Sequence, residues 1–100
     1  MLAAVEKSQG KHNNVQRILK NIDLAREGLA WCIEQGLSAY AVDVEKSRPK
    51  ILIESSAKLQ RFVAVGLAAQ IGASHEGGVH ARVMCLNFHG CQIMWVERGH

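Results

Sequence analysis

The sequence contains one proline, 5% aromatic residues and no apolar run near the roughly 20 residues that a membrane-spanning helix needs. Its apolar start, residues 1–5, is interrupted at once by Glu6 and Lys7, so no secretory signal is predicted. The three cysteines are an odd number, which argues for reduced thiols and against a disulfide framework. We therefore expect a cytoplasmic protein that is not embedded in a membrane.

Catalytic motifs are also missing. The sequence has no glycine-rich phosphate loop, no serine nucleophile elbow and no metalloprotease helix motif. Ser55 and Ser56 are better placed to cap a helix than to act as nucleophiles. A site assembled from distant residues, such as Asp43 with a histidine, stays open as an alternative. We expect neither enzymatic activity nor a cofactor.

The composition is that of a globular domain. Apolar residues make up 48% of the chain and charged residues 21%, unlike the composition of a disordered chain. A chain of 100 residues has room for one core, so we expect a single domain over residues 1–100, with 1–12 as a flexible arm. The net charge of +3 permits contact with nucleic acid without requiring it.

A long amphipathic helix is predicted from Asn14 to Gln35. Its apolar residues recur at alternating spacings of three and four, which is the helical period. Asn13 or Asn14 can cap its start, and Gly36 can end it. The predicted core stripe consists of Val15, Ile18, Ile22, Ala25, Leu29 and Cys32, widened by Leu19 and Ile33.

Two strands at residues 39–44 and 50–54 are predicted to form a hairpin, because apolar and polar residues alternate in both. In the first strand this alternation places Tyr40, Val42 and Val44 on one face. A second helix is predicted to start after Ser55 or Ser56 and to stop near Gly72.

After a loop at residues 73–78, strands at 79–87 and 91–97 are predicted to form a second hairpin. The residues between them fit a type I turn with a glycine bulge, which would place Cys85 and Cys91 on one face beside Val83 and Trp95. A two-residue turn at His89 and Gly90 would separate the two cysteines.

The order helix, hairpin, helix, hairpin indicates an α+β domain with a mostly antiparallel four-stranded sheet and two helices packed on one face. The repeated order also suggests an internal duplication, although helix followed by hairpin is common without one. A sheet of this kind leaves its other face to solvent or to a partner.

Metal-capable side chains are concentrated toward the C-terminus. Their spacing matches no compact pair of zinc ligands, and buried cysteine is common in cores. Core packing is therefore the favoured interpretation, and a zinc-stabilised domain is the alternative. These residues are His75, His80, Cys85, His89, Cys91 and His100.

A basic segment carries the cations that contact with a phosphate backbone requires. Glu45 and Glu54 interrupt it, and no aromatic residue is interleaved for base stacking, so a solvated basic loop is the favoured interpretation and nucleic-acid contact is the alternative. The candidate phosphate contacts are Lys46, Arg48, Lys50, Lys58 and Arg61.

A protein interface is predicted on the side of the first helix opposite its main stripe, at Leu24, Gly28 and Trp31. The last hairpin is apolar on both faces, so Trp95 is a second candidate anchor. A two-fold symmetric homodimer would cover such surfaces.

The C-terminal segment Gly90-Cys91-Gln92-Ile93-Met94-Trp95-Val96-Glu97, followed by His100, resembles the ending of small uncharacterised proteins from phage or prophage genomes. The resemblance covers about a tenth of the chain. It implies a mobile-element accessory protein that binds a host protein, and it assigns a role to no residue.

Three functions follow from these features. The leading prediction is a non-catalytic protein-interaction domain, homodimeric, with an unidentified protein partner. The second is a nucleic-acid-binding accessory protein that uses residues 46–61. The third is a zinc-stabilised small domain.

Overall fold

The computed structural model describes the backbone of residues 2–99 and the side chains of residues 14–75 and 77–99. The helices are α1 (Leu2–Gln35) and α2 (Gln60–Ala64), and a 3-10 turn at Ala57–Leu59 leads into α2. The strands are β1 (Ala39–Asp43), β2 (Lys50–Ile53), β3 (Ala68–Glu76), β4 (Val79–Phe88) and β5 (Cys91–Arg98).

All five strands belong to one sheet in the order β1-β2-β5-β4-β3. Its pairs are antiparallel except for β2 and β5, which run parallel with Ile51 beside Ile93. The α+β class is therefore confirmed. The expected four-stranded sheet is wrong in detail, because a fifth strand forms and because the first hairpin joins the sheet through a parallel contact.

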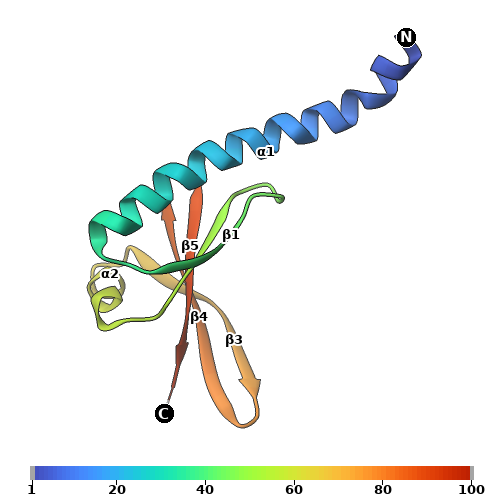
Figure 1. Cartoon of the computed structure of the whole chain (residues 1–100). Coiled ribbons are helices and arrows are strands. Elements are labelled where there is room, and N and C mark those ends of the chain that lie inside the picture. Colours follow the sequence, from blue (N-terminus) through green and yellow to red (C-terminus); the bar gives the residue numbers. More distant parts are fainter. Residues whose placement is uncertain (1, 100) are drawn as a thin grey trace.

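Helix α1 lies across one face of the sheet, and its N-terminal part runs past the sheet (Figure 1). A 34-residue helix is about 51 Å long at 1.5 Å per residue, which accounts for most of the 60 Å length of the molecule. The predicted start at Asn13 or Asn14 is wrong, because the helical backbone continues to Leu2 through residues 2–12, the segment predicted as a flexible arm. The predicted end at Gln35 is confirmed.

Gly36 ends α1 as expected. Its φ of 72° is left-handed, its N–H bonds to the Ile33 carbonyl at 3.1 Å, and the Leu37 N–H reaches back to the Cys32 carbonyl at 2.8 Å. This is the Schellman pattern, in which glycine avoids the strain that a Cβ would cause. The side chain of Leu37 is then buried against the core.

The second helix is much shorter than predicted. Gly66, with φ of 79°, repeats the Schellman pattern: its N–H bonds to Val63 and the Leu67 N–H bonds to Phe62. The chain then turns into β3, so residues 68–72 are strand where helix was expected. The predicted loop at 73–78 is also wrong, because β3 continues to Glu76 and only Gly77 and Gly78 form the turn.

The β4–β5 connection is the two-residue alternative. Phe88 pairs with Cys91, and His89 and Gly90 have φ of 48° and 86°, as a type I′ turn requires. The bulged turn is therefore wrong, and it would have shifted the register by one residue. Cys91 shares the helix-covered face with Ile93 and Trp95, and Cys85 lies on the open face.

One core lies between the sheet and the two helices. Ile51, Ile53, Ile93 and Trp95 are at most 1% exposed. Both helices contribute to this cluster, α1 through Cys32 and α2 through Phe62, and Trp31 packs against it. Within residues 2–99, no helix combines the length and apolar character needed to cross a membrane.

Candidate functional site

Cations of the loop between β1 and β2 and of the first residue of β2 come together at one place on the surface. Lys46, Ser47, Arg48 and Lys50 line one surface pocket of about 390 Å³ together with Gln92 of β5. Three of the five candidate phosphate contacts, Lys46, Arg48 and Lys50, therefore come together. Ser47 and Gln92, which also line the pocket, carry a hydroxyl and an amide.

Helix α1 holds this loop in place. The side chain of Asn21 is 2% exposed, and its Nδ2 donates to the carbonyls of Val44 (3.1 Å) and Lys46 (2.6 Å). Arg17 Nη2 donates to the Glu45 carbonyl at 2.8 Å. Leaving a buried donor or acceptor without a hydrogen-bond partner costs free energy, so the bonds of buried Asn21 fix the conformation of the loop.

The two ends of the loop are fixed as well. Asp43 Oδ1 accepts the Glu45 N–H at 3.0 Å, a local turn typical of aspartate. Pro49 is fully buried, and its carbonyl accepts the Gln92 N–H at 2.9 Å. The loop therefore has a defined backbone conformation before any ligand arrives.

The loop cations also act on the open face of the sheet. Burial raises the pKa of the Cys85 thiol, and the positive charges of Lys50 and Arg48 partly offset this increase. These two cations are therefore close enough to Cys85 to affect the pKa of its thiol.

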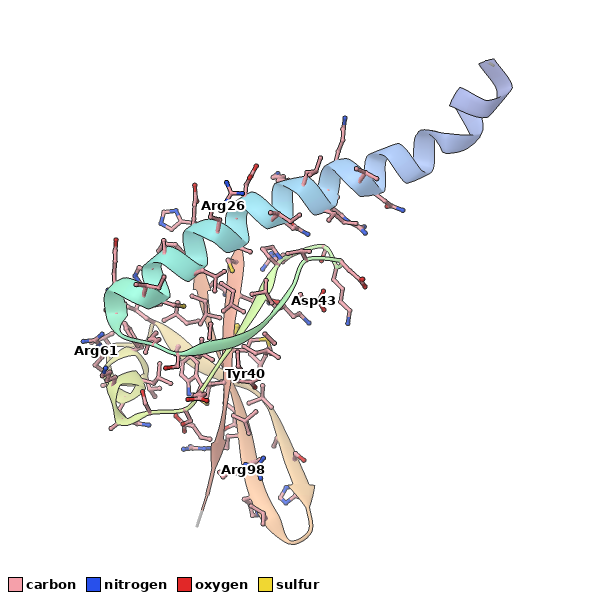
Figure 2. The ribbon with its side chains drawn as sticks, in the orientation of Figure 1. Arg26, Tyr40, Asp43, Arg61 and Arg98 are labelled. Carbon is pink, nitrogen blue, oxygen red and sulfur yellow. The ribbon has the colours of Figure 1, made fainter. Side chains whose placement is uncertain are left out.

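The other two candidate phosphate contacts lie elsewhere. Lys58 Nζ donates to the Gly36 carbonyl at 3.1 Å, and Arg61 Nη2 donates to Gln35 Oε1 at 2.7 Å, so both lie at the C-terminal end of α1. Figure 2 shows Arg61 on α2, well apart from Asp43, the last residue of β1 before the loop. Cations there complement the negative end of the helix dipole, which gives them a structural role.

The predicted interface residues are packed within the chain itself. Trp95 is 1% exposed. The ring of Trp31 lies 5.4 Å from that of Phe62 and 5.2 Å from that of Phe88, centroid to centroid. Leu24 and Trp31 are half-buried, and Trp31 packs against the core.

Gly28 explains why this face of α1 lies against the sheet. A Cβ at Gly28 would lie 2.8 Å from Cδ1 of Ile51 and 3.0 Å from Sγ of Cys91. The helix can approach the sheet this closely only because residue 28 has no side chain. The close backbone approach predicted for this glycine therefore occurs within the chain.

Much of the predicted core stripe of α1 is exposed instead. Ile33 is 77% exposed, Leu19 56%, Val15 52% and Ile22 38%. With half-buried Leu29, these residues form what we call the α1 seam, and Arg26 lies among them. Its inner edge adjoins Val42 of β1 and Val44, which follows this strand; both line a pocket with Ile22 and Leu29.

The open face of the sheet is apolar too, as predicted, although its residues differ. Register places Val83 and Cys85 of β4 with Met94 and Val96 of β5 on this face. Tyr40 lines a pocket with Val96, whereas Val42 lies on the α1 side, because a bulge near Tyr40 breaks the expected alternation.

Known proteins offer no guide. No family model, curated protein or solved structure matches the chain.

The predicted zinc ligands do not converge. Cys85 and Cys91 point to opposite faces, and His75 and His80 form a ring contact at 4.0 Å on the β3–β4 hairpin. Among the described side chains, no group of three or more His, Cys, Asp or Glu residues could hold a metal ion. His100 lies outside the described residues.

The buried thiols are poor nucleophiles. Burial raises the pKa of the Cys91 thiol from 9.0 to about 11, with smaller contributions from Cys32 and Cys85, and burial also raises the pKa of Cys32. Since the thiolate is the reactive form, these groups are unreactive at neutral pH.

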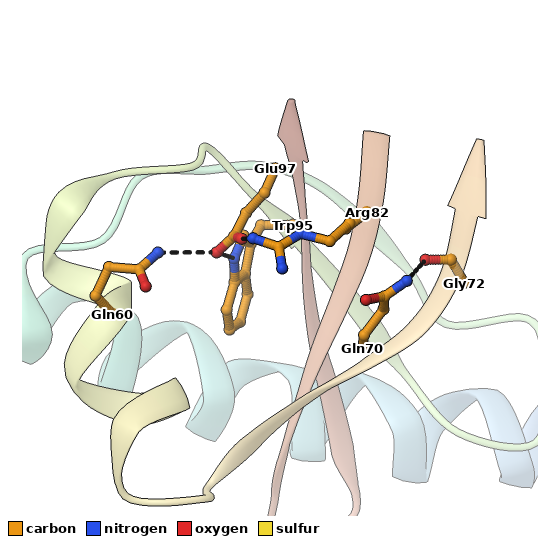
Figure 3. A network of polar contacts seen from close by, with 6 residues as sticks. All are labelled: Gln60, Gln70, Gly72, Arg82, Trp95 and Glu97. Atoms are coloured by element: carbon orange, nitrogen blue, oxygen red, sulfur yellow. Dashed lines mark hydrogen bonds and ion pairs between the residues drawn. The ribbon is translucent and has the colours of Figure 1, made fainter. Parts of the chain in front are cut away.

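Glu97 is the centre of a polar network that ties α2 to the sheet (Figure 3). Its carboxylate accepts hydrogen bonds from Trp95 Nε1 at 3.2 Å and Gln60 Nε2 at 3.1 Å, and it pairs with Arg82 at 2.8 Å. The network satisfies the indole N–H of a buried tryptophan, so its role is structural.

Sequence reasoning missed Asn21, Arg17 and Gln92. The available signal was Asn21, a polar residue within the apolar period of α1 between Ile18 and Ala25. A polar side chain on a buried helix face needs a partner, and the loop carbonyls supply it.

Proposed function

We propose that this chain is a non-catalytic binding domain that works as a homodimer and acts by contact with other proteins. The observation that carries the proposal is the α1 seam. Its six positions alternate at spacings of four and three, as in a coiled-coil helix that has a partner. Four of them carry exposed apolar side chains (Val15, Leu19, Ile22 and Ile33), Leu29 is half-buried, and the sixth is Arg26.

The spacing favours a second copy running antiparallel. The seam positions Val15, Leu19, Ile22, Arg26, Leu29 and Ile33 are symmetric about residue 24. An antiparallel pair therefore places Val15 opposite Ile33 and Leu19 opposite Leu29 in each direction. The seam is complementary to itself, which a two-fold interface requires.

Charge at the centre of the seam fits the same arrangement. Arg26 is opposite Ile22 of the second copy, next to Asp23 of that copy. Within one chain Asp23 and Arg26 are 3.9 Å apart and about three-quarters exposed, so their own pairing is loose. Two copies would bury the stem of each Arg26 on apolar surface and offer its guanidinium a second carboxylate.

The seam is a better candidate than the open sheet face. On that face Leu52, Val83 and Met94 are half-buried, Cys85 is 7% exposed and Val96 is 38% exposed. The seam residues Leu19 and Ile33 are more than half exposed and have more apolar surface to bury.

A nucleic-acid-binding accessory protein is the second candidate function. It is favoured by the convergence of Lys46, Arg48 and Lys50 on one pocket, without Lys58 and Arg61. That the chain serves a mobile element by binding a host protein stays a prediction from the C-terminal resemblance.

The homodimer is tested by two matched double variants. Leu19→Glu with Ile33→Glu puts charge in the seam, whereas Val65→Glu with Ile71→Glu does so at exposed apolar residues elsewhere. Sedimentation equilibrium should give about twice 11.0 kDa for the unmodified protein and the control, and 11.0 kDa for a folded seam variant. A mass that is equal for both variants would refute the seam as the interface.

A further inference from the structure

We propose that the β1–β2 loop and Gln92 form a binding site for a phosphate group. The residues that line the pocket are Lys46, Ser47, Arg48, Lys50 and Gln92, whose side chains carry two ammonium groups, a guanidinium, a hydroxyl and an amide. Each can donate hydrogen bonds, and no carboxylate lines the pocket. Phosphate, with several acceptor oxygens and negative charge, is the ligand that such a donor set fits.

The three cations have no competing ion pairs. Within residues 14–75 and 77–99, the ion pairs join Arg26 to Asp23 and Arg82 to Glu97, and none involves the loop. Two acids lie nearby. Asp43 is opposite Lys50 in the β1–β2 register and accepts the Glu45 N–H, and neither Asp43 nor Glu45 lines the pocket. Like charges held together without a direct ion pair repel, and an anion relieves that repulsion.

The loop is also arranged in advance. Asn21 and Arg17 hold the carbonyls of residues 44–46, and buried Pro49 accepts the Gln92 N–H. A ligand therefore does not have to order the backbone when it binds, which removes one of the main costs of association.

The pocket recognises phosphate rather than a base, because no aromatic side chain lines it for stacking. The phosphate can belong to a nucleic-acid backbone or to a small phosphorylated molecule. In the first case binding is independent of sequence and falls steeply with salt.

The test uses a labelled DNA duplex and inorganic pyrophosphate as probes on the full chain. The loop variant is Lys46→Gln with Arg48→Gln, both at exposed residues, and the control is Lys20→Gln with Arg98→Gln, which removes the same charge elsewhere. Duplex binding is followed by fluorescence anisotropy at low salt, and pyrophosphate binding by the rise in Tm.

For a nucleic-acid backbone, the loop variant should bind the duplex about tenfold or more weakly than the control, and its salt slope should fall by about two. For a small phosphorylated ligand, pyrophosphate should raise the Tm of the unmodified protein and the control but not that of the loop variant. The proposal is overturned if neither probe binds, or if the two variants bind equally. Because both variants spare the α1 seam, this failure would leave the homodimer proposal standing.

Discussion

Gly28 lies where α1 comes closest to the sheet. Replacing it with valine forces methyl groups into space held by Ile51 and Cys91, both fully buried. We expect the free energy of unfolding to fall by about 3 kcal/mol, at the upper end of overpacking costs. Urea unfolding measures this.

The matched control is Ala30→Val, an exposed position on the same helix. It introduces the same β-branched side chain into α1, so helix propensity alone should cost only a few tenths of a kcal/mol. Equal losses in the two variants would show that α1 does not pack closely at Gly28.

Cys91 makes the stability depend on pH. Its pKa is about 11 in the folded chain against an ordinary 9.0, so the unfolded state loses this proton first as the pH rises. The Cys91 thiol therefore adds on the order of 2 kcal/mol to the free energy of unfolding below pH 9, and this contribution is lost as the pH rises from 9 to 11. Unfolding by urea across this pH range should show the decrease.

Cys91→Ala should flatten that part of the pH profile, although it lowers stability throughout by leaving a cavity. If the profile is as steep in Cys91→Ala as in the unmodified protein, another group causes the decrease. Thiol reagents should also react slowly with the native chain.

At the level of elements, local signals located most boundaries. Gly36 ends α1, and the strands of both hairpins lie within about one residue of their predicted positions, because these features depend on local backbone preference and alternation. Asn87 to Gly90 allowed two turns, and only the pairing of β4 with β5 decides between them.

The end of α2, strand β3 and the buried face of α1 were not predicted, because they depend on contacts between residues distant in sequence. Residues 66–72 kept a helical spacing of apolar side chains, but Gly66 ends α2 and the chain pairs with β4 instead. The buried face of α1 was misassigned for a similar reason. Its apolar residues cover more than one face, and the choice depends on Gly28 and on the packing of Trp31 against Phe62 and Phe88.

Only part of the candidate site could be predicted, because some of its residues are close in sequence and others are distant. Lys46, Arg48 and Lys50 are close in sequence, so their convergence is local and could be expected. Lys58 and Arg61 looked contiguous with them, but β2 carries the chain away to the other end of α1. Asn21 acts across 23 to 25 residues of sequence, which a linear pattern does not reveal.

At the level of the whole molecule, the chain is a long helix on a small sheet. It measures 60 × 33 × 22 Å, and between residues 14 and 35 one side of α1 exposes Val15, Leu19, Ile22 and Ile33. A domain of this size gains little stability from its own core, and pairing α1 with a second α1 would bury more apolar surface. The phosphate pocket lies on the β1–β2 loop, so each copy in a dimer keeps its own set of cations.

The most direct test of the homodimer is a distance between two copies. A spin label on Glu34→Cys lies at an exposed position off the seam, and the native thiols are at most 7% exposed. In the antiparallel pair the two labels are about 20 residues apart along the helix axis, so pulsed electron spin resonance should give about 30 Å. A parallel pair would bring them within roughly 10 to 20 Å at the usual helix spacing. The absence of any intermolecular distance, or only the short one, would contradict the antiparallel homodimer.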